Sequence, residues 1–231
     1  MAELITRSSP YAFWAFYSLY RHLSSKNVAA FSFETVCEKL YPNVRVNPDE
    51  KVSLFVTWHQ MSETTCNYRL RGCIGTFAKL PVVQGVERYA IVAALEDSRF
   101  SPIAEKELPK LECSCNILHN FETIFKMEEI PQGDIHNWEV GQHGIELRFR
   151  DPSGGRTRSA TFLPEVMPEQ KWNQEETFIN LIEKAGCWKS VTKIMENPGK
   201  YFIEVIRYEA TKSEITYKQF IEELGLLGAE S

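Results

Sequence analysis

The stretch Arg69-Leu70-Arg71-Gly72-Cys73-Ile74-Gly75-Thr76-Phe77 combines two arginines, a cysteine between two glycines, and apolar residues suited to a β-strand. Glycines this close together indicate a backbone that bends, adopts a positive φ or is approached closely by another group. A thiol held there is a nucleophile, a ligand or a small buried side chain. Cys73 is therefore the first candidate functional residue of the chain.

The segments on either side of this stretch predict a hairpin followed by a helix. Residues 51–58 alternate between apolar and polar side chains, which is typical of a strand. The polar residues 59–67 predict a hairpin loop, and residues 69–77 the returning strand. A helix is expected over residues 81–97, with Pro81 near its start.

The remainder of the chain mixes strands and helices without a regular βαβ repeat. Ser9 and Pro10 open a first helix with an aromatic face, and later helices follow Asn173 and Thr216, with Gly186 and Gly225 as their ends. Further strands are expected over residues 111–118, 145–150, 158–163 and 201–208. The predicted class is α+β, with a mostly antiparallel sheet packed with helices.

Composition limits the classes of function. The chain has 231 residues, of which 43% are hydrophobic and 25% charged, as in ordinary soluble globular proteins. Its net charge of −5 argues against a protein that binds nucleic acid through an overall positive charge, but it does not exclude binding through a local basic patch. No apolar run is long enough to cross a membrane, and residues 1–7 do not resemble a secretory signal.

The six cysteines do not resemble a disulfide framework in a chain of this length, which favours reduced thiols in the cytoplasm, the nucleus or both. Cys113 and Cys115, with Cys66 and Cys73, offer four sulfurs, but their spacing differs from the common Cys-x2-Cys zinc knuckle. Alternation places Cys113 and Cys115 on one face of a strand, so we expect both in the core and no metal site.

Catalysis by Cys73 requires a base or a cation beside the thiol. Arg71 is two residues away and shares its face if the strand is regular, and His119, His136 and His143 are possible bases. The alternative, a thiol packed between glycines, is favoured when these residues are read alone.

Asp97 follows Glu96 at the end of the predicted helix, where acidic side chains are unfavourable to the helix dipole. We therefore expect Asp97 to have a specific partner, either Arg99 or Arg71. The alternative is an ordinary salt bridge or a cap of the following turn.

Two later segments also hold polar groups between glycines or prolines. Glu139, His143 and Gly144 lie just before a predicted strand, and His143 is either an acid, base or ligand, or a hydrogen-bonding loop residue. Glu165, between Pro164 and Pro168, is either a general base or a loop carboxylate. Rigid segments that present polar groups at the ends of strands commonly build a pocket.

Seven segments of the chain together carry a family resemblance. They are the hexapeptide Leu70-Arg71-Gly72-Cys73-Ile74-Gly75 and, in the same order along the chain as in the family, residues 54–58, 97–100, 107–109, 138–141, 143–145 and 162–166. With these segments the chain resembles the AMMECR domain family, whose hallmark is similar to the hexapeptide. The resemblance implies an α+β fold with a larger and a smaller lobe and a cleft between them. It implies a single domain of two lobes over residues 9–210, with residues 211–231 as a strand and helix extension packing on it.

The resemblance does not indicate a particular biochemical activity, because none is established for the family. The reaction is therefore a hypothesis drawn from the residues. The leading hypothesis is an enzyme or enzyme subunit that acts on a nucleotide, RNA or small anionic substrate. Catalytic candidates are Cys73, His143 and Glu165; ligand-binding candidates are Arg71, Gly72, Gly75, Asp97, Ser98, Arg99, Glu139 and Gly144. The alternative is a non-catalytic module that binds a protein partner with the same surface. Cofactor and oligomeric state stay open.

Overall fold

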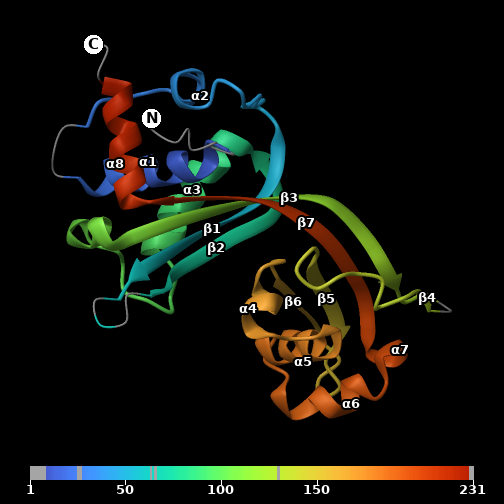
Figure 1. Cartoon of the computed structure of the whole chain (residues 1–231). Helices are drawn as coiled ribbons and strands as arrows, with labels where there is room; N and C mark the ends of the chain where they lie inside the picture. The colour runs from blue at the N-terminus through green and yellow to red at the C-terminus, as the bar shows by residue number, and fades with distance from the viewer. Residues whose placement is uncertain (1–8, 25–27, 63, 65–66, 129–130, 229–231) are drawn as a thin grey trace. The chain divides into compact units, whose positions relative to one another are not determined.

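The computed structural model describes residues 9–24, 28–62, 64, 67–128 and 131–228 (Figure 1). The expectations for residues 1–7 and for Cys66 fall outside these residues. The chain divides into two compact units: unit 1 comprises residues 1–117 and 211–231, and unit 2 comprises residues 118–210. Each unit has its own hydrophobic core.

Among the described residues, unit 1 contains a hairpin, four α-helices, one 3₁₀ helix and parts of two long strands. In chain order its elements are α1 (Tyr11–Leu23), α2 (Phe33–Leu40), β1 (Lys51–Met61), β2 (Tyr68–Pro81), α3 (Val82–Leu95), the 3₁₀ helix η1 (Glu105–Lys110) and α8 (Tyr217–Gly228). The long strands β3 (Leu111–Lys126) and β7 (Phe202–Thr216) each run from one unit into the other.

The hairpin of β1 and β2 is antiparallel, and one irregularity in it decides the geometry of the candidate site. Trp58 pairs with Gly72, whereas the next residue of β1, His59, pairs with Leu70. Arg71 is therefore an extra residue in β2, which makes a β-bulge. Beyond the bulge, Cys73 pairs with Thr57 and Gly75 with Phe55.

Helix α3 packs against one face of this hairpin at very short range. The indole Nε1 of Trp58 donates to the carbonyl oxygen of Ala90 at 3.0 Å. A Cβ atom at Gly72 would lie 2.1 Å from the carbonyl oxygen of Ala93, so only glycine permits this approach. Because cross-strand partners share a face, Trp58 and Gly72 face α3, and Thr57 and Cys73 lie on the opposite face.

Unit 2 combines the second part of the sheet with short helices. Its elements are β4 (Gln132–Gly133), β5 (Gly144–Arg150), β6 (Thr157–Phe162), α4 (Val166–Gln170), α5 (Gln174–Lys184), the 3₁₀ helix η2 (Trp188–Ser190), α6 (Val191–Met195) and α7 (Pro198–Tyr201). Asn173 caps α5 as expected, because its side chain accepts from the backbone N–H of Glu176 at 2.9 Å. The core of unit 2 includes Phe149, Phe178 and Phe202.

The hydrogen-bonded order of the strands is β2-β1-β3-β7-β5-β6, with β4 paired to β3. The pairs β1–β2, β3–β4, β5–β6 and β5–β7 are all antiparallel. The predicted α+β class with a mostly antiparallel sheet is therefore confirmed. Cys113 and Cys115 are fully buried in the core of unit 1, as expected. Within the described ranges, no helix has both the length and the apolar character needed to cross a membrane.

Candidate functional site

Cys73 lies on β2, the strand at the end of the hydrogen-bonded order, and its thiol is partly exposed. The hydroxyl Oγ1 of its cross-strand partner Thr57 donates to the Cys73 sulfur over 3.1 Å. A hydrogen bond from a hydroxyl stabilises a thiolate more than a thiol. The hairpin thus supplies the cysteine with a polar neighbour, which the alternation of strand residues alone did not predict.

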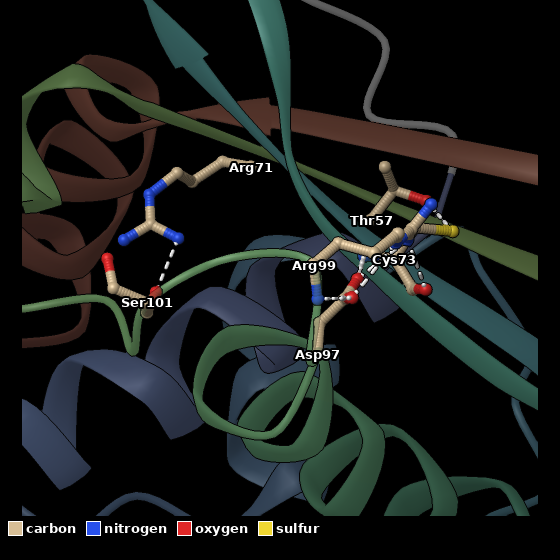
Figure 2. A network of polar contacts seen from close by, with 6 residues as sticks. All are labelled: Thr57, Arg71, Cys73, Asp97, Arg99 and Ser101. Atoms are coloured by element: carbon tan, nitrogen blue, oxygen red, sulfur yellow. Dashed lines mark hydrogen bonds and ion pairs between the residues drawn. The ribbon is translucent and has the colours of Figure 1, made fainter.

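An ion pair covers the backbone of β2 at Cys73. The backbone N–H of Cys73 donates to Asp97 Oδ2 at 2.9 Å, and Arg99 Nη2 donates to the carbonyl oxygen of Cys73 at 3.2 Å (Figure 2). The two side chains therefore satisfy both backbone groups that a further strand would otherwise bind. We call Cys73, Asp97 and Arg99, with Thr57, the thiol clamp.

Asp97 and Arg99 are held to each other by several bonds. Arg99 Nη2 lies 2.6 Å from Asp97 Oδ2, and Arg99 Nε lies 2.9 Å from Oδ1, which also accepts from the Arg99 backbone N–H at 3.1 Å. The Arg99 side chain lowers the pKa of the Asp97 carboxyl to about 2; burial opposes this shift, and the N–H groups of Cys73 and Arg99 add to it. Of the two partners expected for Asp97, Arg99 and Arg71, it is Arg99 that forms the ion pair.

The two members of this ion pair differ in their access to solvent. The Asp97 side chain is 4% exposed, whereas the Arg99 side chain is 54% exposed. In the described part of the chain, Nη1 of Arg99 has no hydrogen-bond partner. Arg99 thus keeps donors for a ligand while its other nitrogens hold the clamp.

Arg71 has a different position from the one that a regular strand would give it. The bulge interrupts the alternation, and Figure 2 shows its side chain pointing toward Ser101 and away from the thiol. Its Nε donates to Glu107 Oε1 at 3.0 Å and its Nη1 to the carbonyl oxygen of Ser101 at 2.7 Å. Arg71 is 9% exposed and holds the segment that leads into η1. Its role in binding a ligand stays a prediction.

The remaining candidates of unit 1 are two glycines and a serine. Gly72 faces α3, and a Cβ atom at Gly75 would lie 2.2 Å from Cγ of Phe55 and 2.3 Å from the carbonyl oxygen of Leu54. Both glycines are therefore needed for close packing, and their expected part in ligand binding stays a prediction. Ser98 is exposed between the two members of the ion pair.

The other candidates lie in unit 2. His143 is 8% exposed, and its Nδ1 accepts from the backbone N–H of Glu139 at 3.1 Å, so a neutral ring carries its proton on Nε2. A Cβ atom at Gly144 would lie 2.3 Å from the ring of Tyr208. The structure thus brings Glu139, His143 and Gly144 together in one turn, and Cys73, Asp97 and Arg99 together in unit 1.

Tyr208 is a buried group of unit 2 that the sequence did not single out. Its hydroxyl donates to the carbonyl oxygen of Phe162 at 3.0 Å and lies 2.7 Å from Thr161 Oγ1. Burial raises the pKa of Tyr208, and the charge of the Glu165 carboxylate adds to the rise while Thr161 opposes it. Glu165 itself is half-buried at the start of α4.

We expect Tyr208→Phe to lower the free energy of unfolding by about 1 kcal/mol, because it leaves buried partners of the hydroxyl without a hydrogen bond. Chemical denaturation of both proteins measures this loss. Tyr68→Phe is the matched control, since Tyr68 is 36% exposed and should change stability little. Equal stability of the Tyr208→Phe variant and the parent would contradict the assignment of these bonds.

Comparison with known proteins identifies relatives along most of the chain. The AMMECR1 family model matches residues 14–213. The chain is 55% identical to the uncharacterized protein YOR289W of Saccharomyces cerevisiae, over 94% of this chain and 89% of the relative. It is 33% identical to the uncharacterized protein At2g38710 of Arabidopsis thaliana, over 86% of this chain and 88% of the relative.

A solved structure also has a similar fold. The crystal structure of the uncharacterized protein PH0010 from Pyrococcus horikoshii matches with a TM-score of 0.60, at 22% sequence identity. The match covers 91% of this chain and 94% of the other. At this level of identity the likeness concerns the fold alone.

Proposed function

Because this chain belongs to the AMMECR1 family, whose members compared above are uncharacterized, we propose its function from the thiol clamp itself. The proposal is an enzyme, or a subunit of one, that acts on a small anionic substrate at Cys73. The observation that carries it is a partly exposed cysteine, hydrogen-bonded to Thr57, next to Arg99, whose Nη1 has no hydrogen-bond partner among the residues that the structure describes.

Each residue of the clamp has a distinct role in this proposal. Cys73 is the nucleophile, and the Thr57 hydroxyl stabilises its thiolate form. Nη1 of Arg99 binds an anionic group of the substrate, and Asp97 positions Arg99 and the backbone of Cys73. Arg71 holds the neighbouring segment through Glu107. The proton-transfer roles expected of His143 and Glu165 stay predictions.

The experiment measures how small anions protect Cys73 from alkylation by iodoacetamide. A small-molecule cell extract is separated by anion exchange into anionic and neutral fractions, and modification of the Cys73 peptide is followed by mass spectrometry. We expect the anionic fraction to slow the reaction by about threefold or more, the effect of a bound anion present at about twice its dissociation constant. The neutral fraction should have no effect.

Two arginine variants localise this effect. Arg99→Gln should remove the protection, whereas Arg69→Gln, which changes an exposed arginine on the same strand, should keep it. Equal alkylation rates with and without the anionic fraction would contradict the proposal. Protection that survives in Arg99→Gln would contradict the role of Arg99.

A second candidate function is a non-catalytic module that docks a protein partner on β2. Leu70 and Tyr68, which lie on the same strand, are 41% and 36% exposed and favour this alternative. It predicts that Cys73→Ser retains partner binding while Arg99→Glu abolishes it. The enzymatic proposal instead requires the thiol, so that Cys73→Ser abolishes turnover.

The compartment is part of the proposal. We place the protein in the cytoplasm, the nucleus or both, because Cys37, Cys73, Cys113, Cys115 and Cys187 all carry free thiols. Fractionation of cells that express the full chain tests this assignment.

A further inference from the structure

An aromatic side chain lies beside the thiol clamp on the same face of the β1–β2 hairpin. Thr57 pairs with Cys73, and two residues away on each strand Phe55 pairs with Gly75. The register is regular between these two pairs, so all four positions are on the face opposite α3. Because a strand rises about 3.3 Å per residue, Gly75 is about 7 Å from Cys73. Phe55 and Gly75 are therefore the next pair along this face from the thiol.

The ring of Phe55 leans across to β2 and covers Gly75. A Cβ atom at Gly75 would lie 2.2 Å from Cγ and 2.4 Å from Cδ1 of this ring, so the ring fills the space that a side chain at position 75 would need. Diagonal neighbours on one face of a strand pair are within reach of an aromatic side chain. The ring thus lies over the strand that carries Cys73, one side-chain position away from the thiol.

Phe55 does not take part in the packing of either core. Among the described residues, it belongs to neither hydrophobic core and is not one of the partly buried side chains that pack against them. It meets the ring of Phe77 nearly edge-on, with centroids 5.8 Å apart and an interplanar angle of 71°. Phe55 is also partly exposed. An aromatic side chain with these properties, next to a candidate nucleophile, offers apolar surface to a ligand.

Arg99 fixes where an anionic group can bind relative to this ring. Its guanidinium lies over the ring of Phe100, 5.5 Å from the centroid, and its Nη2 donates to Asp97 and to the carbonyl oxygen of Cys73. These contacts hold the cation at the edge of β2 beside Cys73. The site therefore combines a thiol, a cation at the edge of the strand and an aromatic ring on its face.

We propose that the substrate of Cys73 is an aromatic acid, a small molecule in which a flat unsaturated ring carries an anionic group. This inference rests on the function proposed above and narrows its substrate class. Arg99 binds the anionic group, and Phe55 packs against the ring. Offset-stacked and edge-to-face aromatic pairs are more favourable than the buried area alone implies, which favours a flat ring over a saturated ring of similar size. The spacing of about 7 Å between Cys73 and Gly75 fits one ring with a short chain.

The test compares three phenyl acids with their saturated counterparts as protectants of Cys73 against iodoacetamide. The probes are benzoate, phenylacetate and 3-phenylpropionate, each matched with the cyclohexyl acid of the same chain length. The charge is equal within each pair, so a difference in protection reports the flat ring. At least one phenyl acid should give half-maximal protection at a concentration about fivefold lower than its cyclohexyl counterpart, as expected for one aromatic pair. Mass spectrometry of the Cys73 peptide follows the reaction.

Variants assign this preference to Phe55. Phe55→Leu should remove the difference between phenyl and cyclohexyl acids, whereas Phe55→Tyr, which keeps the ring, should retain it. Tyr68→Leu, which removes an exposed aromatic side chain elsewhere on β2, should also retain it. The rate of alkylation without any acid should be the same in Phe55→Leu as in the parent, because this substitution leaves the thiol clamp in place.

The outcomes separate this inference from the proposed function. Equal protection by phenyl and cyclohexyl acids in the parent chain, or a preference that survives in Phe55→Leu, would overturn the inference and leave the proposed function standing. The same conclusion follows if the anionic fraction of the cell extract protects Cys73 and none of the six acids does. If neither the fraction nor any acid protects the thiol, the proposed function fails and this inference fails with it.

Discussion

Gly72→Ala is expected to lower the free energy of unfolding by about 3 kcal/mol or more, the upper range for inserting an atom into a packed core. The new Cβ atom would lie 2.1 Å from the carbonyl oxygen of Ala93, which belongs to the backbone of α3. Neither the strand nor the helix can move easily, because β2 is paired with β1 and α3 accepts a hydrogen bond from Trp58. Relief of the clash therefore requires the helix or the strand to move.

Alanine substitutions at two other glycines serve as controls, and chemical denaturation measures the free energy of unfolding of all three variants and the parent. A Cβ atom at Gly85 would meet the movable end of the Leu54 side chain at 2.7 Å, so Gly85→Ala should cost less than Gly72→Ala. A Cβ atom at Gly225 has nothing within 4 Å, so Gly225→Ala in α8 should be neutral or slightly stabilising. A Gly72→Ala protein as stable as the parent would show that α3 does not pack at this distance.

Asp97→Asn is expected to lower the free energy of unfolding by about 2 kcal/mol at pH 7, the value of a shift of the carboxyl pKa from 3.8 to about 2. The amide cannot hold the Arg99 guanidinium as a charged acceptor does. The loss should loosen the backbone of Cys73, because Asp97 accepts its N–H.

The sign of the pH dependence follows from the direction of this shift. The pKa of Asp97 is lower in the folded protein than in the unfolded chain, so its stabilising contribution is complete above about pH 4 and is lost as the pH falls toward 2. The difference in stability between Asp97→Asn and the parent should therefore shrink over that interval. Denaturation curves at several pH values measure it.

Asp49→Asn provides the control for this series, because Asp49 is exposed, and it should leave stability nearly unchanged at every pH. A difference between Asp97→Asn and the parent that stays constant down to pH 2 would contradict the ion pair as its cause.

The sequence predicts the local parts of the fold well, because they depend on neighbouring residues. The alternation in β1 and the cap at Asn173 both lead to the observed elements. Strand β3 continues to Lys126, whereas the sequence predicts a strand only to residue 118. The second half of the strand was missed because it is largely polar and exposed and lacks a clear alternation of apolar and polar residues. Helix α8 continues to Gly228, so the expected end at Gly225 is wrong; an exposed helix tolerates that glycine at modest cost.

The candidate site shows the same division between local and distant effects. Asp97 and Arg99 are two residues apart, and their pairing could be predicted from the unfavourable position of the acid. Glu107 is 36 residues from Arg71, and nothing in the sequence signals that they meet. The bulge at Arg71 could not be predicted from the sequence either, because it depends on the register between β1 and β2.

The rate ratio of alkylation at Cys73 by iodoacetate and iodoacetamide tests the central claim most directly, because the two reagents differ mainly in charge. If Arg99 attracts anions to the thiol, the ratio should fall about threefold or more in Arg99→Gln, as expected for loss of one nearby cation. It should change little in Arg99→Lys, which keeps the charge, and in Arg69→Gln. A ratio that is the same in the parent and in Arg99→Gln would contradict the claim that this thiol receives an anionic substrate.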